Sequence, residues 1–335
     1  MSASTKNKKA SVFGFFWNAG AGLLKLTSLA GAGWILYSNL VIDHAVPLDN
    51  ALLGNRISLE NDLAGKVNIY ASETGTGRPL VLLHSINAAA SAYEMKPIFD
   101  HYQGKRPVYA LEWPGFGKSE RKAVRYSPDL YSRVLNQFIE SLGGKTPDVI
   151  ALSLGSEFAA RAASLRQEMF HSLVLISPSG LGKSRGGRNE NQTGQLHSIL
   201  SAPLWGRPLY DLVATRVSIR WFLKKSFVGE PPQDLVDYCY ASAHQPGAQN
   251  APLFFLSGSL FTANVLESIY MHLQVPTRVI YDQDFYVRFD RLEELLNNNS
   301  NFSASRLIPS RGLPQFEMLD ELTSDLDRYW DSLSK

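Results

Sequence analysis

The sequence predicts an α/β fold: a mostly parallel β-sheet flanked by helices, with an inserted helical lid and an additional apolar helix near the N-terminus. The first observation is that short β-branched segments alternate with helical stretches from about Lys66 onward, the pattern of a sheet covered by helices. The second is that residues 179–275 separate two consecutive predicted strands, which is too long for a loop without structure of its own. The third is a run of mostly apolar and small residues over 12–42.

The composition excludes several classes of protein. Lys and Arg number 33 against 31 Asp and Glu, so the chain lacks a basic surplus and no nucleic-acid partner is expected. The one cysteine, Cys239, excludes an intrachain disulfide and a cysteine-based zinc cluster. No metal and no cofactor is predicted. A length of 335 residues permits one large domain or two small ones.

Local patterns place the elements of the alternating region. Apolar and β-branched runs predict strands over Val67–Ala71, Leu80–His84, Val108–Leu111, Asp148–Leu152, Ser172–Ile176, Thr277–Tyr281 and Arg306–Ile308. Helical patterns predict helices over Ala88–Tyr102, Pro128–Leu142, Ser156–Gln167 and Met318–Leu333. The last helix is amphipathic, so one of its faces is expected to pack on the sheet.

These elements divide the chain into four parts. They are an N-terminal membrane anchor or amphipathic helix over 1–45, a polar linker over 46–64, a core formed by 65–178 and 276–335, and the lid over 179–275. The lid contains clusters of apolar and aromatic residues, among them Trp205, Trp221 and Phe222. These clusters favour a helical lid with its own packed interior.

The N-terminal apolar run admits three interpretations. Its uncharged part, Leu26–Ile42, has about 17 residues, the lower limit for a helix that crosses a bilayer. A membrane-spanning anchor is favoured; an interfacial or partner-docked helix is one alternative, and a cleaved signal peptide interrupted by Lys25 is the other. Lysines precede the run, so a spanning helix would place the large domain on the exoplasmic or periplasmic side. An interfacial helix would leave that domain on the cytoplasmic face.

One serine follows a predicted strand directly and opens the next helix. Ser153 lies in the frame Ala151-x-Ser153-x-Gly155. Small residues on both sides permit the tight strand-to-helix turn that exposes a nucleophile above a helix N-terminus. Ser153 is therefore the candidate nucleophile.

Other segments, in the same order, resemble blocks of the α/β-hydrolase superfamily, and the resemblance covers residues 65–335 with the lid included. Leu80–Ser85 resembles the strand before the oxyanion loop, with Ser85 in place of a glycine. Arg106–Ser119 resembles the D-x-P-G-x-G-x-S block, with Glu112 in place of the aspartate. Val275–Asp282 resembles the strand before the catalytic acid, and Ile308–Glu317 resembles the segment that carries the catalytic histidine. The resemblance implies a lid-containing fold like that of esterases, lipases and epoxide hydrolases. It also implies an oxyanion hole formed by the N–H groups of Leu154 and Ile86.

The resemblance fails at the residues that would complete a catalytic triad. Phe285 occupies the position of the acid, and Asp284 beside it is a weaker candidate acid in a shifted register. Gly312 occupies the position of the histidine, and Gln315 that of a second histidine in the family segment. No histidine follows His272. The predicted triad is therefore degenerate.

Loss of the base has a large chemical consequence. A serine hydroxyl is a poor nucleophile unless a positioned base removes its proton. Without that base, turnover falls by roughly 10⁴ to 10⁶. A substitute base is an alternative: His84 borders the oxyanion loop and is a weak candidate, and His197 and His244 in the lid are others.

Two functional hypotheses follow from these residues. In the first, the protein is a membrane-associated pseudoenzyme that binds an apolar small molecule or lipid, or a membrane-protein partner, through its pocket, lid or N-terminal residues 12–42. In the second, it is an esterase- or lipase-like serine hydrolase of a lipophilic substrate that uses Ser153 and a non-standard base.

Overall fold

A single sheet with the strand order β1-β2-β4-β3-β5-β6-β7-β8 organises the computed structural model, which describes residues 28–183 and 189–334. The antiparallel edge is formed by β1 and β2, and the six remaining strands run parallel. The strands are β1 (Asn55–Asn61), β2 (Gly65–Ser72), β3 (Leu80–Leu83), β4 (Val108–Leu111), β5 (Asp148–Leu152), β6 (Ser172–Ile176), β7 (Thr277–Tyr281) and β8 (Phe302–Arg306). The predicted mostly parallel sheet is confirmed.

Helices cover both faces of this sheet. Along β3, Val81 and Leu83 belong to one apolar cluster whereas Leu80 and Leu82 belong to another, as the period-2 alternation of a strand requires. The first cluster includes residues of α4 (Pro128–Glu140), α5 (Gly155–Leu165) and α12 (Leu292–Asn298). The second includes residues of η1 (Ala92–Met95), α3 (Lys96–Tyr102) and α14 (Leu319–Leu333). Strands β3 to β6 are therefore buried on both sides.

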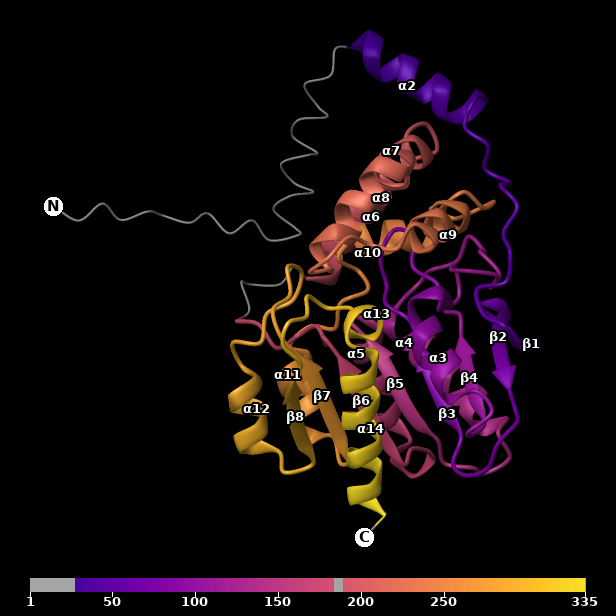
Figure 1. Cartoon of the computed structure of the whole chain (residues 1–335). Helices are drawn as coiled ribbons and strands as arrows, with labels where there is room; N and C mark the ends of the chain where they lie inside the picture. Colours follow the sequence, from indigo (N-terminus) through magenta and orange to yellow (C-terminus); the bar gives the residue numbers. More distant parts are fainter. Residues whose placement is uncertain (1–27, 184–188, 335) are drawn as a thin grey trace, which may run out of the picture.

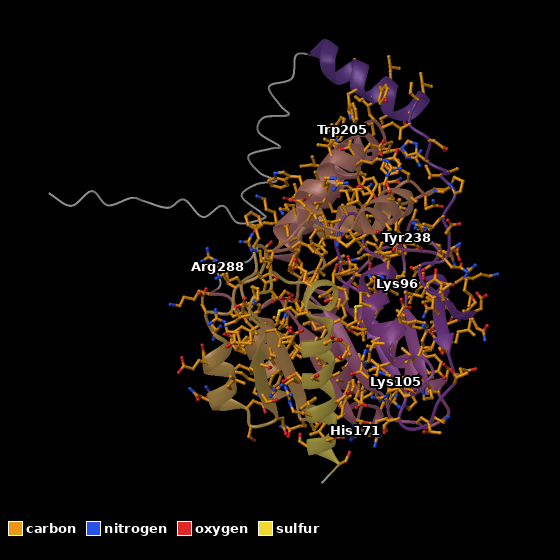
Figure 2. The ribbon with its side chains drawn as sticks, viewed as in Figure 1. Lys96, Lys105, His171, Trp205, Tyr238 and Arg288 are labelled. Atoms are coloured by element: carbon orange, nitrogen blue, oxygen red, sulfur yellow. The ribbon has the colours of Figure 1, made fainter. Side chains whose placement is uncertain are left out.

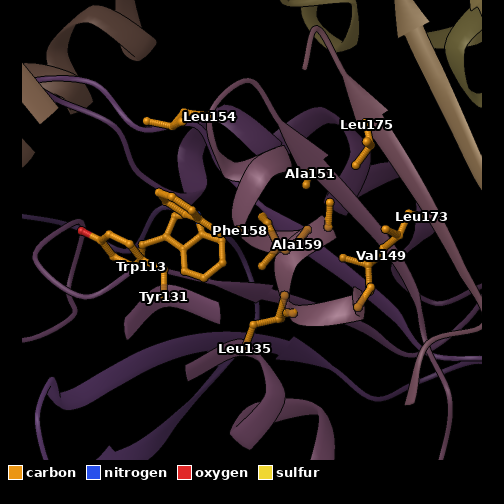
Figure 3. Packing of buried hydrophobic residues seen from close by; sticks show 14 of the residues in the cluster. Trp113, Tyr131, Leu135, Val149, Ala151, Leu154, Phe158, Ala159, Leu173 and Leu175 are labelled. Atoms are coloured by element: carbon orange, nitrogen blue, oxygen red, sulfur yellow. The ribbon is translucent and has the colours of Figure 1, made fainter. Parts of the chain in front are cut away.

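An aromatic group packs on α4 and α5 directly behind the turn that follows β5. Figure 3 shows Trp113, Tyr131 and Phe158 gathered there. The rings of Tyr131 and Phe158 stack with centroids 4.7 Å apart, and Trp113 meets both edge to face. All three side chains are fully buried. The turn therefore rests on a rigid, close-packed base.

The lid lies between β6 and β7, where the sequence predicts it. Figure 1 shows its helices gathered at one end of the sheet. They are α6 (Glu190–Leu200), α7 (Gly206–Val213), α8 (Arg216–Lys225), α9 (Gln233–Ala243) and α10 (Asn250–Ser257), and α11 (Val265–Ser268) and η3 (Tyr270–His272) lead back to β7. Two short elements complete the described chain: η2 (Gln167–Met169) and α13 (Pro314–Glu317).

The N-terminal helix α2 (Ser28–Leu40) is shorter than the predicted apolar run and lies against the lid. The Trp34 indole N–H donates to the carbonyl of Pro208 at 2.8 Å, and the Ser38 hydroxyl donates to Asp211 at 2.6 Å. Within 28–183 and 189–334, no helix has the length and apolar character needed to cross a membrane. The spanning helix expected over Leu26–Ile42 is therefore not seen there; α2 has 13 residues, and Leu26 and Thr27 lie outside the described residues.

Three predicted boundaries differ from the structure. The polar linker over 46–64 contains β1, an edge strand whose residues are mostly exposed, so no apolar alternation marks it. The last strand lies at Phe302–Arg306 rather than Arg306–Ile308. The helix predicted from Ala88 begins at Ala92, because the residues between β3 and Ala92 form a loop.

Candidate active site

Ser153 occupies a strained turn between β5 and α5. Its φ of +53° lies in the left-handed region, which costs a non-glycine residue of order 1 kcal/mol or more. The Ser153 N–H donates to the carbonyl of Ile176 on β6 at 2.9 Å, which ties the turn to the sheet. A Cβ at Gly155 would lie 2.6 Å from the His84 carbonyl oxygen, so only glycine fits there. The predicted tight turn from strand to helix is present.

The two predicted oxyanion donors border the same space. Leu154 and Ile86 line a cavity together with Ser153. Neither backbone N–H donates a hydrogen bond to another residue in the described part of the chain. Both groups are therefore free to donate to an oxygen atom of a bound molecule.

This cavity has a volume of about 210 Å³ and lies between the sheet and the lid. Lid residues form its apolar wall: Val213, Ile219, Phe222, Leu223, Phe255 and Phe261. Its polar lining comes mainly from the sheet side: Ser85, Asn87, Glu94, Ser153, Ser179 and Asp284. A second hollow of about 450 Å³ lies between β8 and α14, where Arg278 and Asp325 pair, and it contains none of the predicted site residues. We therefore place the candidate site in the smaller cavity.

The carboxyl group in the cavity is that of Asp284. Its Oδ1 accepts the N–H groups of Tyr286 at 2.7 Å and Val287 at 3.1 Å. Burial raises the pKa of Asp284 to about 6, against the lowering effect of those hydrogen bonds. Phe285, which occupies the acid position in the sequence pattern, is 41% exposed and does not line the cavity. Asp284, the candidate in the shifted register, is therefore the residue that brings a carboxyl group into the cavity, and Phe285 is not part of it.

Gly312 lines the cavity beside that carboxylate. A Cβ built on Gly312 would lie 2.6 Å from Oδ2 of Asp284. The φ of Gly312 is +114°, which L-residues rarely adopt. The Asp284 oxygen therefore occupies the space into which a side chain at position 312 would project.

Comparison with known proteins agrees with this architecture. The family model described as "Alpha/beta hydrolase family" matches residues 80–323, which is more than half of the chain. The chain belongs to the alpha/beta hydrolase family. A curated relative, 2-hydroxy-6-oxo-6-(2'-aminophenyl)hexa-2,4-dienoic acid hydrolase of Metapseudomonas resinovorans, is 30% identical over 125 residues, 35% of this chain and 41% of that protein. A haloalkane dehalogenase of Agrobacterium fabrum is 22% identical over 112 residues, 33% of this chain and 36% of that protein.

Solved structures of alpha/beta hydrolases share the fold over most of this chain. A membrane phospholipase A, described as a bacterial virulence factor, has 19% identity and a TM-score of 0.65, covering 96% of this chain and 97% of its own. A probable hydrolytic enzyme of Pseudomonas aeruginosa has 16% identity and a TM-score of 0.65, covering 84% and 95% of the two chains. At this level of identity the likeness shows the fold alone.

None of the alpha/beta hydrolase's seven histidines lines the cavity, and all seven lie within the described residues. His84, the weak candidate base, is fully buried, with Nδ1 bonded to the Ser85 carbonyl and Nε2 accepting the Trp113 N–H. Burial lowers the pKa of His84 to about 3. Backbone contacts therefore hold His84 outside the cavity, and its weak candidacy as a substitute base finds no support in this geometry.

The lid histidines are also directed elsewhere. His197 stacks on Phe254 with ring centroids 3.6 Å apart. His244 stacks on Tyr240, and its Nδ1 is bonded to the Tyr240 carbonyl. Oγ of Ser153 forms no hydrogen bond with any residue of the described ranges. The structure thus brings together Ser153, Leu154, Ile86, Asp284 and Gly312, but supplies no imidazole.

Gln315 and Glu94 form a buried connection between two distant segments of the chain. Gln315, at the second histidine position, is fully buried and donates through Nε2 to the Glu94 carbonyl at 3.0 Å. The Glu94 carboxyl accepts the N–H and hydroxyl of Ser85 and the amide of Asn87. Burial raises the pKa of Glu94. The signal for Glu94 in the sequence is a glutamate between Tyr93 and Met95, shortly after Ser85 and Ile86.

Proposed function

We propose that this alpha/beta hydrolase binds a mainly apolar small molecule or lipid in its cavity and has lost ordinary ester turnover. One observation supports the proposal above all. In a triad, the imidazole of the base contacts the acid. Here Gly312 lies beside Oδ2 of Asp284, and no histidine lines the cavity. A serine hydroxyl without a base to accept its proton cannot sustain rapid acyl transfer. The apolar lid wall and the free oxyanion N–H groups suit a ligand with an apolar body and one polar end.

An ester hydrolysis assay tests the loss of turnover. Purified full-length protein is compared with Ser153→Ala on p-nitrophenyl butyrate. We expect the two rates to agree within about tenfold, because the missing base accounts for most of a triad's effect. A kcat above about 1 s⁻¹, in the range of ordinary enzymes, that Ser153→Ala abolishes would contradict the proposal.

The alternative function is hydrolysis of a lipophilic substrate with a non-standard base. The left-handed φ of Ser153 and the unbonded N–H groups of Leu154 and Ile86 favour it, since both are features of a nucleophile turn. Under this alternative, a fluorophosphonate probe labels the wild type within minutes and does not label Ser153→Ala. Absence of labelling in the wild type would leave the binding function as the better account.

We also propose that residues 12–42 and the adjacent part of the lid attach the protein to a membrane. The outer face of α2 and its end present apolar side chains to solvent, with Leu36 59%, Leu40 78% and Val41 62% exposed. Trp205, before α7, is also partly exposed at the end of the lid that α2 covers (Figure 2). An apolar helix face joined to an apolar N-terminal run suits an interfacial location. The structural similarity to a membrane phospholipase A gives further support.

Liposome flotation tests the attachment. The full chain should float with phosphatidylcholine–phosphatidylglycerol vesicles. A variant without residues 1–27 that carries Leu36→Glu and Leu40→Glu should remain in the unbound fraction. Leu165→Glu is the matched control, because Leu165 is equally exposed but lies on α5 of the core. Flotation of the multiple variant to the same extent as the full chain would contradict this assignment.

A further inference from the structure

Asp284 is a buried carboxylate whose charge is not matched by any cation of the described residues. Its environment consists of two backbone N–H donors, the Ser177 hydroxyl and the cavity. None of the ion pairs formed by the described residues includes Asp284. Buried carboxylates in proteins are normally paired, because an isolated charge in an apolar environment is costly. The Asp284 carboxylate therefore lacks the cationic partner that buried carboxylates usually have.

The absence of a side chain at position 312 explains why the partner is missing. In a serine hydrolase the acid is hydrogen-bonded to the imidazole N–H of the base. Here Oδ2 of Asp284 lies only 2.6 Å from where the Cβ of residue 312 would be, so the oxygen takes the place of that side chain. Both Gly312 and Asp284 line the cavity with Ser153. The carboxyl group of Asp284 thus borders the space where a bound molecule would lie.

Apart from the backbone N–H groups of Leu154 and Ile86, the described lining of the cavity offers no positive charge that would balance a negative head group. Among the described residues, no Lys, Arg or His side chain contributes to the lining. A second buried carboxyl group, that of Glu94, lines the same cavity near Ser85. Its oxygens already accept hydrogen bonds from Ser85 and Asn87, whereas both backbone N–H groups at Asp284 donate to Oδ1 and its Oδ2 lies beside Gly312 at the cavity wall. A carboxylate ligand would meet like charge and no compensating cation.

From these contacts we infer that the ligand carries a nitrogen cation, such as a primary amine or a protonated heterocycle, which pairs with Asp284, and that its apolar tail lies against the lid wall. The amine N–H groups replace the imidazole N–H that the carboxylate lacks. The tail contacts Leu223, Phe255 and Phe261, which close the cavity on the lid side. The cost of burying the carboxylate is already present in the unliganded protein, so pairing yields a net gain. This inference rests on the proposed binding function and specifies the chemical class of the ligand.

Calorimetric titration with three probes of equal chain length tests the inference. The probes are hexylamine, hexanol and hexanoate at pH 8, where the amine is protonated. We expect hexylamine to bind at least about tenfold more tightly than hexanoate, with hexanol between them. If hexanoate binds as tightly as hexylamine or more tightly, the inference is wrong, and this result needs no variant.

Two variants locate the responsible charge. Asp284→Asn retains an Oδ1 that accepts the two backbone N–H groups, so the fold is expected to persist, and its thermal unfolding is recorded as a check. We expect this variant to lose the preference for hexylamine over hexanoate. Glu293→Gln is the control, because it removes one carboxylate on the exposed side of α12, outside the cavity, and it should keep the preference. A preference that survives Asp284→Asn, or that Glu293→Gln reduces equally, would overturn the assignment to Asp284.

The titrations and the hydrolysis assay together distinguish a wrong head group from a wrong binding function. If none of the three probes binds and the protein hydrolyses p-nitrophenyl butyrate at an enzymatic rate, both the binding function and the inference are wrong. If all three bind with equal affinity, the cavity still takes an apolar molecule, but the nitrogen head group is wrong.

Discussion

Position 312 combines an unusual backbone conformation with a close carboxylate. The φ of Gly312 is +114°, and Oδ2 of Asp284 would lie 2.6 Å from a Cβ at this position, so there is no room for a side chain. The carboxylate and the backbone together fill the space that a histidine at position 312 would need. Restoration of a histidine therefore requires a change in the backbone as well as in the side chain.

Gly312→His is expected not to restore hydrolysis. Its Cβ would meet the Asp284 oxygen, and its backbone would be strained, so the ring would not reach a productive position. The rate on p-nitrophenyl butyrate should stay within about tenfold of that of Ser153→Ala. Gly312→Ala controls for the backbone effect and should lower the free energy of unfolding by about 1–3 kcal/mol. Recovery of enzymatic turnover in Gly312→His would show that the loop relaxes freely.

Glu157 on α5 provides a residue-scale prediction about pH. Burial raises its pKa from 4.5 to about 7, although Ser179 and Thr262 donate hydrogen bonds to it. The folded state therefore binds this proton more tightly than the unfolded state. The resulting stability is complete below about pH 4.5 and is lost as pH rises through 7, by at most about 3 kcal/mol.

Urea denaturation at pH 5 and pH 8 measures this contribution. Glu157→Gln, which is close in shape and does not titrate, should reduce the loss of unfolding free energy between the two pH values by about 1–3 kcal/mol. Other buried carboxyl groups titrate equally in both proteins, so the difference between them isolates Glu157. Identical pH dependence in the two proteins would contradict the assignment.

At the scale of elements, the docking of α2 on α7 depends on one buried carboxylate. Asp211 accepts the Ser38 hydroxyl at 2.6 Å and is bonded to Nε2 of His44 at 3.0 Å. Its side chain is fully buried. Hydrogen bonds to a buried charged group contribute more than neutral ones, about 1.5–3 kcal/mol. The position of α2 is therefore determined mainly by this carboxylate and by the Trp34 indole.

Ser38→Ala should loosen α2 without unfolding the domain. The loss of one hydrogen bond to Asp211 should speed amide hydrogen exchange of residues 35–40 by about tenfold or more. Asn39→Ala is the matched control, because its side chain bonds only within α2 and is exposed. Equal exchange rates in the two variants would show that other contacts hold the helix.

The elements of the core were largely predictable because their strands are short, apolar and separated by helical patterns. β3, β4, β5, β6 and β7 were placed within a residue or so by that alternation. β1 was missed because an edge strand exposes most of its residues, so its sequence resembles a loop. The sequence also pointed to Ser153, Leu154, Ile86 and Asp284, which the structure places around one cavity, while their catalytic roles stay predictions. The position of Glu94 in the cavity wall and the close contact of Asp284 with Gly312 depend on contacts between distant segments. A single sequence does not reveal such contacts.

At the scale of the whole molecule, the lid and the sheet enclose the cavity while the aromatic group of Trp113, Tyr131 and Phe158 supports the Ser153 turn from behind. Phe158 belongs to α5, which begins two residues after the serine. The conformation of the turn therefore depends on core packing as well as on local hydrogen bonds.

Phe158→Ala should lower the global free energy of unfolding by about 3–5 kcal/mol, because it leaves a cavity at a fully buried aromatic contact. Leu165→Ala on the same helix is the control and should change it by less than about 0.5 kcal/mol, since Leu165 is 55% exposed. Chemical denaturation followed by tryptophan fluorescence measures both. A loss below about 1 kcal/mol for Phe158→Ala would show that the neighbouring rings collapse into the space.

Two adjacent residues of α7 face opposite neighbours. Asp211 is bonded to α2, whereas the Tyr210 hydroxyl donates to the carbonyl of Ala88, in the oxyanion loop, at 2.7 Å. Adjacent residues of α7 thus form a continuous path of contacts from helix α2 to the loop that contains Ile86, which lines the cavity. If α2 attaches the protein to a membrane as we propose, this path places the attachment two hydrogen bonds away from the cavity wall.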